Sequence, residues 1–90
     1  MTSPVISVII ASYNQEKYIS RCLRSLISQT ISRDKFEIVV INDGSTDRSA
    51  SVLNEFANEI VLIDNDKNIG LPASLNKAIR RARAPFVVRV

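Results

Sequence analysis

The chain has 90 residues, of which 46% are hydrophobic and 23% are charged, and its net charge is +3. These values are typical of one small globular domain and exclude a disordered chain. An aromatic content of 6% is too low for a surface that stacks nucleic-acid bases, so we expect no nucleic-acid partner, and the absence of histidine excludes histidine ligands and general bases.

The single cysteine, Cys22, cannot form a disulfide within the chain, which favours a reducing compartment. The opening "MTSPVISVII" lacks the basic segment and cleavage site of a secretory signal. No apolar run approaches the roughly 18–20 residues that a membrane span needs. We therefore expect a cytoplasmic domain, although a longer parent protein could be membrane-associated through segments elsewhere.

The first half of the chain predicts strand, helix and strand. The β-branched run "VISVIIA" at 5–11 is typical of a strand buried on both faces. A helix is predicted over about 15–29, a loop over 30–35, and a second strand, "FEIVVIN", over 36–42. The apolar stripe of the helix, which we expect to be buried, consists of Ile19, Cys22, Leu23, Leu26 and Ile27.

The second half repeats this alternation. Ser45 or Thr46 is expected to cap a helix that runs through about residue 57, with Asp47 in its first turn. A third strand is predicted over 59–64, and Pro72 suits the first turn of a helix that extends to about residue 83. A fourth strand, "FVVRV", follows over 86–90. The side chains expected to face inward are Ala50, Leu53, Phe56 and Ala57 on the second helix, and Leu75, Ala78, Ile79 and Ala82 on the third.

This alternation predicts an α/β fold, a three-layer Rossmann-like α/β/α arrangement around a mostly parallel four-stranded sheet. Ligands of such sheets bind at the carboxyl ends of the strands. The polar segments "SYN" at 12–14, "NDGSTD" at 42–47 and "DNDKNIG" at 64–70 each follow a strand. We therefore expect these three segments to line one edge of the sheet and to form the site.

Several common sites of α/β proteins are excluded by their missing motifs. The chain has no G-x-G-x-x-G, no P-loop and no G-x-S-x-G, and it lacks the residues for a structural zinc site. Among the residues that remain, the ring of Tyr13 can stack on a planar base, and the carboxylate of Asp43 can accept an N–H from the base edge. An acceptor of that kind selects an imide N–H such as that of uracil.

Each of these residues has a second, purely structural interpretation. Tyr13 can cover the end of the core, and Asp43 can satisfy the backbone of its own turn. Ser45 and Asp47 can serve the start of a helix. Asn68 and Gly70 can form a tight turn in which Gly70 has a positive φ. The basic set of Lys77, Arg80, Arg81 and Arg83 can be a solvated helix face.

The segments "PVISVIIASYNQEKYISRCLRSLISQT", "FEIVVINDGSTDRS" and "NIGLPASLNKAIRRARAPFVVRV" together resemble the N-terminal half of inverting family 2 glycosyltransferases of the GT-A fold. The resemblance covers nearly the whole chain, with three motifs in the right order and spacing. It implies that residues 1–90 are the nucleotide-binding part of a longer domain that uses nucleotide-activated sugars, most commonly with uracil as the base.

The resemblance also implies roles for individual residues. Tyr13, Asn14 and Asp43 would surround the nucleoside, with the backbone at Ala11 and Ser12 as the pocket floor, and Asp43 would recognise the base of UDP. The remaining nucleotide-binding residues implied are Ser45, Asn68 and Gly70, of which the last two match the family's N-x-G turn on the diphosphate side. The sequence departs from the family at Leu75, where a basic residue often precedes the asparagine matched by Asn76.

The catalytic machinery of the family is expected outside these 90 residues. The metal-binding D-x-D follows the fourth strand in the family, and the catalytic base lies in its second half. The implied reaction is direct displacement of the diphosphate by an acceptor hydroxyl, with Mg²⁺ or Mn²⁺ stabilising the leaving group. The sequence thus predicts no catalytic residue and no metal ligand within the chain, and an inactive chain on its own.

Two other functions are compatible with parts of the sequence. The apolar strand over 86–90 would be an exposed sheet edge, so the chain could be a non-catalytic interaction module that self-associates there. A nucleotidyltransferase is the third reading, but such enzymes use a glycine-rich basic loop after the first strand, and "ASYNQEK" contains no glycine.

Overall fold

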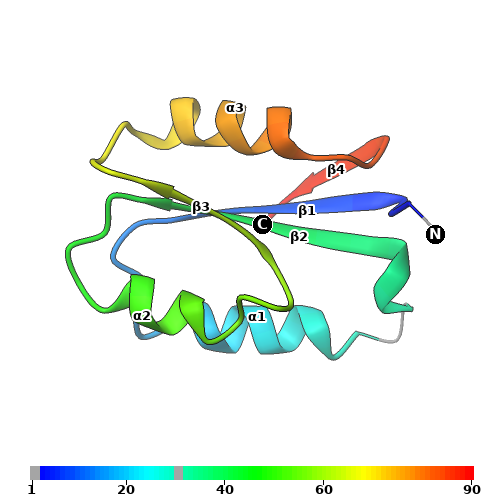
Figure 1. Ribbon diagram of the computed structural model, residues 1–90, viewed down its shortest axis with the longest axis horizontal. Coiled ribbons are helices and arrows are strands. Elements are labelled where there is room, and N and C mark those ends of the chain that lie inside the picture. The colour runs from blue at the N-terminus through cyan, green and yellow to red at the C-terminus, as the bar shows by residue number, and fades with distance from the viewer. Residues whose placement is uncertain (1–2, 30–31) are drawn as a thin grey trace.

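Strands and helices alternate along the chain in the order that the sequence predicts (Figure 1). The computed structural model describes residues 3–29 and 32–90, so part of the loop predicted over 30–35 lies outside the described residues. The elements are β1 (Ile6–Ser12), α1 (Ile19–Ile27), a 3₁₀ turn η1 (Arg33–Lys35), β2 (Phe36–Asp43), α2 (Ser49–Asn54), β3 (Val61–Asn65), α3 (Leu71–Arg81) and β4 (Phe86–Arg89).

The four strands form one parallel sheet in the order β3-β2-β1-β4. Helices α1 and α2 cover one face, and α3 covers the other (Figure 1). The predicted three-layer α/β/α arrangement is therefore confirmed. Because all strands are parallel, their carboxyl ends and the loops that follow them gather at the same edge of the sheet.

The central strand β2 is buried along its whole length because both of its faces and both of its edges are covered. Successive side chains of a strand point to opposite faces. Accordingly, Ile38 and Val40 pack with Leu23 of α1 and Leu53 of α2 on one side. Val39 and Ile41 pack with Ala78 of α3 on the other side. Cys22 is partly buried against the first of these clusters, as its place in the apolar stripe predicts.

Helix α2 begins later than the sequence predicts, and the expectation that Ser45 or Thr46 caps it is wrong. The N-cap position is Arg48, and the helix starts at Ser49. The reason is that Ser45 and Thr46 bond to a neighbouring loop instead, as described below. Asp47 does serve the helix start, because its Oδ1 accepts a hydrogen bond from the backbone N–H of Ser49 at 2.8 Å.

Four further expectations about helices are wrong. Helix α1 begins at Ile19 rather than near residue 15, because the backbone from Gln15 to Tyr18 first makes a separate turn. Ala50 lies on α2 but is exposed, and Ala57 lies beyond the end of that helix and is also exposed. Ile79 is 49% exposed. It stands about 100° around the helix from Ala78, which packs on the sheet, so its side chain points beside the sheet.

Strand β4 pairs with β1 on one side, and all of its side chains are exposed. No helix of the described part of the chain is both long and apolar enough to cross a membrane.

Candidate functional site

A cavity of about 290 Å³ opens at the carboxyl edge of the sheet, on the side covered by α3. It is lined by Ala11, Ser12, Tyr13, Asp43, Asn68, Gly70 and Leu71. All of these except Leu71 belong to the nucleotide-binding set that the resemblance implies. The structure therefore brings together the ends of β1 and β2 with the loop between β3 and α3.

Tyr13 follows β1 directly and is 45% exposed at this cavity. A side chain that is nearly half exposed does not serve to seal the core, so its ring is available to a flat apolar ligand group. Next to it, the hydroxyl of Ser12 is buried without a hydrogen-bond partner among residues 3–29 and 32–90. A water molecule or a polar group of a ligand would satisfy that hydroxyl.

Asp43 ends β2 and is buried, with only 4% of its surface exposed. Its Oδ1 accepts hydrogen bonds from the Asn65 amide at 3.0 Å and from the backbone N–H of Ile69 at 2.8 Å. Its Oδ2 accepts one from the backbone N–H of Gly70 at 3.0 Å. The carboxylate thus binds β3 and the β3–α3 loop, not its own turn as the structural interpretation assumed. A carboxylate oxygen can accept two hydrogen bonds, and the backbone N–H of Gly70 is one donor at Oδ2.

The charge of Asp43 is stabilised by these bonds. Burial raises the pKa of a carboxyl group, but the hydrogen bonds from Ile69, Asn65 and Gly70, with a smaller contribution from the Ser74 hydroxyl, outweigh it and lower the pKa below its ordinary value. The group is therefore an ionised acceptor at neutral pH.

The loop between β3 and α3 depends on two glycines with positive φ. Gly70 has the expected positive φ, of 91°, and is the N-cap of α3. Gly44 has φ 67°, and a β-carbon on it would lie 2.8 Å from the α-carbon of Lys67 and would overlap the backbone of Asn68. The side chain of Asn68 donates to the backbone carbonyl of Asp43 at 3.3 Å.

Asn14 and Ser45 do not line the cavity. They tie the loop after β1 to the loop after β2: the backbone N–H of Asn14 donates to Ser45 Oγ at 3.0 Å, and Asn14 Oδ1 accepts from the backbone N–H of Thr46 at 2.8 Å. Asn14 has φ 52°, a conformation that asparagine tolerates better than most residues. Ser45 also donates to the side chain of Asn42.

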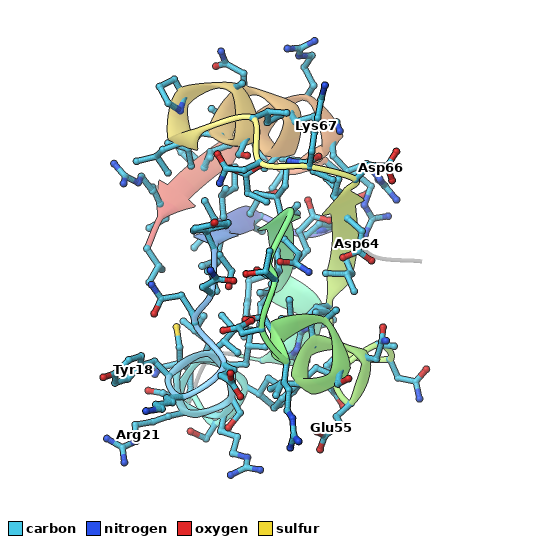
Figure 2. All side chains as sticks on the ribbon, turned by 90° about the vertical axis from the view of Figure 1, so that its left-hand side faces the viewer. Tyr18, Arg21, Glu55, Asp64, Asp66 and Lys67 are labelled. Atoms are coloured by element: carbon cyan, nitrogen blue, oxygen red, sulfur yellow. The ribbon has the colours of Figure 1, made fainter. Side chains whose placement is uncertain are left out.

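The same junction continues toward α2. The backbone N–H of Gln15 donates to the hydroxyl of Ser49 at 3.0 Å, and that of Glu16 donates to Oδ2 of Asp47 at 3.2 Å. Figure 2 looks onto this edge of the sheet and shows Tyr18 and Glu55 on the α1 and α2 side, with Lys67 on the opposite side beside α3. These hydrogen bonds therefore hold the loop after β1 against the loop after β2 and the start of α2.

No group of three or more His, Cys, Asp or Glu side chains in residues 3–29 and 32–90 is arranged to hold a metal ion. The described residues therefore do not form a metal centre of their own.

A second cavity, of about 360 Å³, lies at the opposite edge of the sheet between the starts of β2 and β3. Its charged side chains already have partners. Arg33 forms an ion pair with Glu59 at 3.8 Å, and Glu37 accepts from Arg83 Nε at 3.2 Å. Since the strand-end loops lie at the other edge, we do not assign the ligand site here.

Sequence reasoning missed four residues that shape the site, namely Gly44, Asn65, Leu71 and Ser74. The D-G pair could have flagged Gly44, because glycine after a strand-end aspartate is typical of a turn with positive φ. Asn65 and Ser74 carry no local signal, since their importance comes from contact with Asp43 across the fold.

The chain matches a known protein family. The family profile described as "Glycosyl transferase family 2" matches residues 7–90. The chain is 42% identical to the putative glycosyltransferase EpsH of Bacillus subtilis over 90 residues, which are 97% of this chain and 25% of that protein.

Solved structures give the same result. The TarS 1–349 structure from S. aureus in complex with UDP has a TM-score of 0.88 at 35% identity, over 96% of this chain and 26% of that one. The mannosyltransferase PcManGT from Pyrobaculum calidifontis, in complex with GDP-Man and Mn²⁺, has a TM-score of 0.86 at 29% identity, over 97% and 27%. The chain thus spans about a quarter of the length of these relatives. With its match over residues 7–90, the chain belongs to glycosyl transferase family 2.

Proposed function

We propose that this chain supplies the nucleoside-binding site of a glycosyltransferase that transfers a sugar from a UDP-sugar to an acceptor hydroxyl. The observation that carries the proposal is the cavity in which Tyr13 and Asp43 meet at the carboxyl edge of the sheet. The UDP complex of TarS supports uracil as the base, whereas the GDP-Man complex of PcManGT makes guanine the alternative to test.

In this proposal the uracil ring stacks on Tyr13, and its imide N–H donates to Oδ2 of Asp43. The ionised state of the carboxylate suits that bond, and Oδ2 accepts a single backbone N–H, that of Gly70. Ala11 and Ser12 form the floor, and Asn68 and Gly70 lie toward the diphosphate. Asn14 and Ser45 contribute indirectly, because their hydrogen bond holds the loops after β1 and β2 together.

The remaining chemistry would come from the longer protein. A divalent metal, as in the Mn²⁺ complex of PcManGT, would supply charge stabilisation for the leaving diphosphate and would be held by residues outside this chain. The acceptor hydroxyl would be deprotonated by a base that is also outside it. We expect no transfer activity from the 90 residues alone, and we place the domain in the cytoplasm, which the unpaired thiol of Cys22 supports.

The proposal is tested by adding UDP to the isotope-labelled chain and following its amide signals by NMR. We expect weak binding, with shifts concentrated at Tyr13 and Asp43. Replacing Tyr13→Ala should weaken binding roughly tenfold, the effect of one lost base–aromatic contact. Tyr18→Ala is the matched control, because Tyr18 is 66% exposed at the N-cap of α1 and does not line the cavity.

Shifts that gather elsewhere, or equal losses in the two tyrosine variants, would refute the site. Tighter binding of GDP than of UDP would show that the cavity takes guanine and not uracil as its base. Transfer activity of the 90-residue chain would show that the catalytic groups lie within it after all.

A second role, self-association through β4, is favoured by one observation. Phe86 is 64% exposed, and Val88 and Val90 are about half exposed, on a strand that pairs with β1 alone. A bare apolar edge of this kind can pair with the same edge of a second copy. This role does not compete with nucleotide binding, because β4 contributes no residue to the cavity lining.

A further inference from the structure

A continuous set of hydrogen bonds links an exposed lysine on α3 to the buried carboxylate of Asp43. Lys77 Nζ donates to Asn65 Oδ1 at 2.6 Å. The Nδ2 of the same asparagine donates to Asp43 Oδ1 at 3.0 Å and to Ser74 Oγ at 3.3 Å. Neither Asn65 nor Lys77 lines the cavity, so both act on it through Asp43.

The two partners of Asn65 leave its amide group a single orientation. A carboxylate only accepts hydrogen bonds, and an ammonium group only donates them. The amide must therefore turn its NH₂ toward Asp43 and its oxygen toward Lys77, and the reverse orientation would lose both bonds. The ammonium group also polarises the amide, which strengthens the hydrogen bond on its far side.

The orientation of the Asn65 amide matters because the groups around it are buried. Asn65 and Asp43 are both buried, and Ser74 is fully buried, so bonds lost among them are not replaced by water without cost. Asn65 and Ile69 together occupy Oδ1 of Asp43. Because these two donors fill Oδ1 and fix the plane of the carboxylate, Oδ2 is the oxygen to which a ring N–H would donate.

We propose that Asn65 and Lys77 are positioning residues that set the base selectivity of the cavity by holding Asp43 with Oδ2 available to a ring N–H. The inference rests on the proposed function, because it assigns a selective role to the carboxylate that would contact the base. It adds that selectivity for the N–H is controlled from the outer surface of α3.

The experiment compares two probes, UDP and 3-methyluridine diphosphate, in which a methyl group replaces the ring N–H. The measured quantity is the ratio of their dissociation constants in the unaltered chain and in its variants. A hydrogen bond to a charged acceptor corresponds to roughly a 10- to 100-fold ratio in the unaltered chain. Lys77→Met should reduce the ratio to about threefold or less, and Lys77→Arg should restore most of it.

Arg80→Met is the matched control, because it removes one positive charge from the same helix at an exposed position with no hydrogen bond or ion pair among those described. It should leave the ratio unchanged. Asn65→Leu should abolish the preference, and Lys77→Met keeps the test valid if that buried variant does not fold. A purely structural role of Lys77 would weaken both probes equally and leave their ratio intact.

The outcomes separate the two proposals. A preference for UDP that survives Lys77→Met overturns the positioning role and leaves the proposed function standing. No preference for UDP in the unaltered chain overturns the base contact of Asp43, and the positioning role with it. A ratio that falls in Lys77→Met and not in Arg80→Met supports both.

Discussion

The α-carbon of Gly44 lies so close to the backbone nitrogen of Asn68 that a β-carbon on Gly44 would overlap it. Gly44→Ala must therefore push the β3–α3 loop away from the end of β2. We expect a loss of about 2–4 kcal/mol in the free energy of unfolding, from a strained positive φ plus the displaced backbone. Urea unfolding measures this loss, and UDP affinity should fall with it.

Gly70→Ala is the control for that prediction. Gly70 also has a positive φ, but nothing lies within 4 Å of an added β-carbon. The change should cost about 1–3 kcal/mol of backbone strain alone. Equal losses in the two variants would mean that crowding against Asn68 contributes nothing.

The stability of the fold should depend on pH through Asp43. Its pKa is lower in the folded chain than the ordinary value of 3.8, so the folded state binds this proton more weakly than the unfolded state. The resulting stabilisation is complete above about pH 5 and is lost as the pH falls below about 4 toward the lowered folded pKa.

Unfolding free energies of the unaltered chain and of Asp43→Asn, measured from pH 7 to pH 3, test this dependence. The difference between the two proteins should be largest near neutral pH and should shrink as the carboxyl group becomes protonated. A difference that stays constant over this range would show that the charge of Asp43 has no part in stability.

Glu37 and Arg83 provide a test at the opposite edge of the sheet. Glu37 is buried, and it accepts bonds from the backbone N–H of Arg83 at 2.6 Å and from the hydroxyl of Ser7 at 2.5 Å. Glu37→Ala leaves both donors unpaired and should cost about 1–3 kcal/mol. Arg83→Ala should cost less than about 1 kcal/mol, because its side chain is 63% exposed and its backbone N–H remains. Equal costs would contradict this ranking.

The β4 edge predicts concentration-dependent dimers. The backbone N–H of Phe86 donates to Val5, just before β1, and that of Val90 donates to Ile9 of β1. The N–H of Val87 therefore points away from the sheet. Val87→Pro removes that outward donor and should abolish association, whereas Val87→Thr keeps it and should not. Sedimentation analysis distinguishes the two, and a monomer at every concentration of the unaltered chain would end the proposal.

Much of the fold was predictable because buried parallel strands carry a strong signal. The β-branched runs around Ile9 and Val39 mark strands covered on both faces, and the stripe that contains Leu23 marks the inner face of α1. The start of α2 was not predictable in this way. Serine is a common helix N-cap, but the hydroxyl of Ser45 bonds instead to Asn14, 31 positions earlier in the chain, and to Asn42, three positions earlier.

The position of the cavity was predictable from the sequence, but the contacts that each residue makes there were not. Motif position brought Tyr13 and Asp43 to the cavity because Tyr13 directly follows one parallel strand and Asp43 ends the next. The resemblance implied that Asn14 lies beside the nucleoside and that Ser45 binds the nucleotide, whereas in the structure the two bond to each other across two loops. The part of Asn65 depends on a contact with Asp43 from a neighbouring strand, which no local pattern encodes.

The three strand-end loops are joined in series, the first to the second through Asn14 and Thr46, and the second to the third through Asp43 and Ile69. Such a series opens as one cooperative unit, because releasing one junction removes support from the next. The backbone amide hydrogens of Thr46, Ile69 and Gly70 should therefore exchange with solvent at a common rate, although more than twenty residues separate the first from the others. A ligand that binds to the third loop would therefore slow amide hydrogen exchange in the first two loops without touching them.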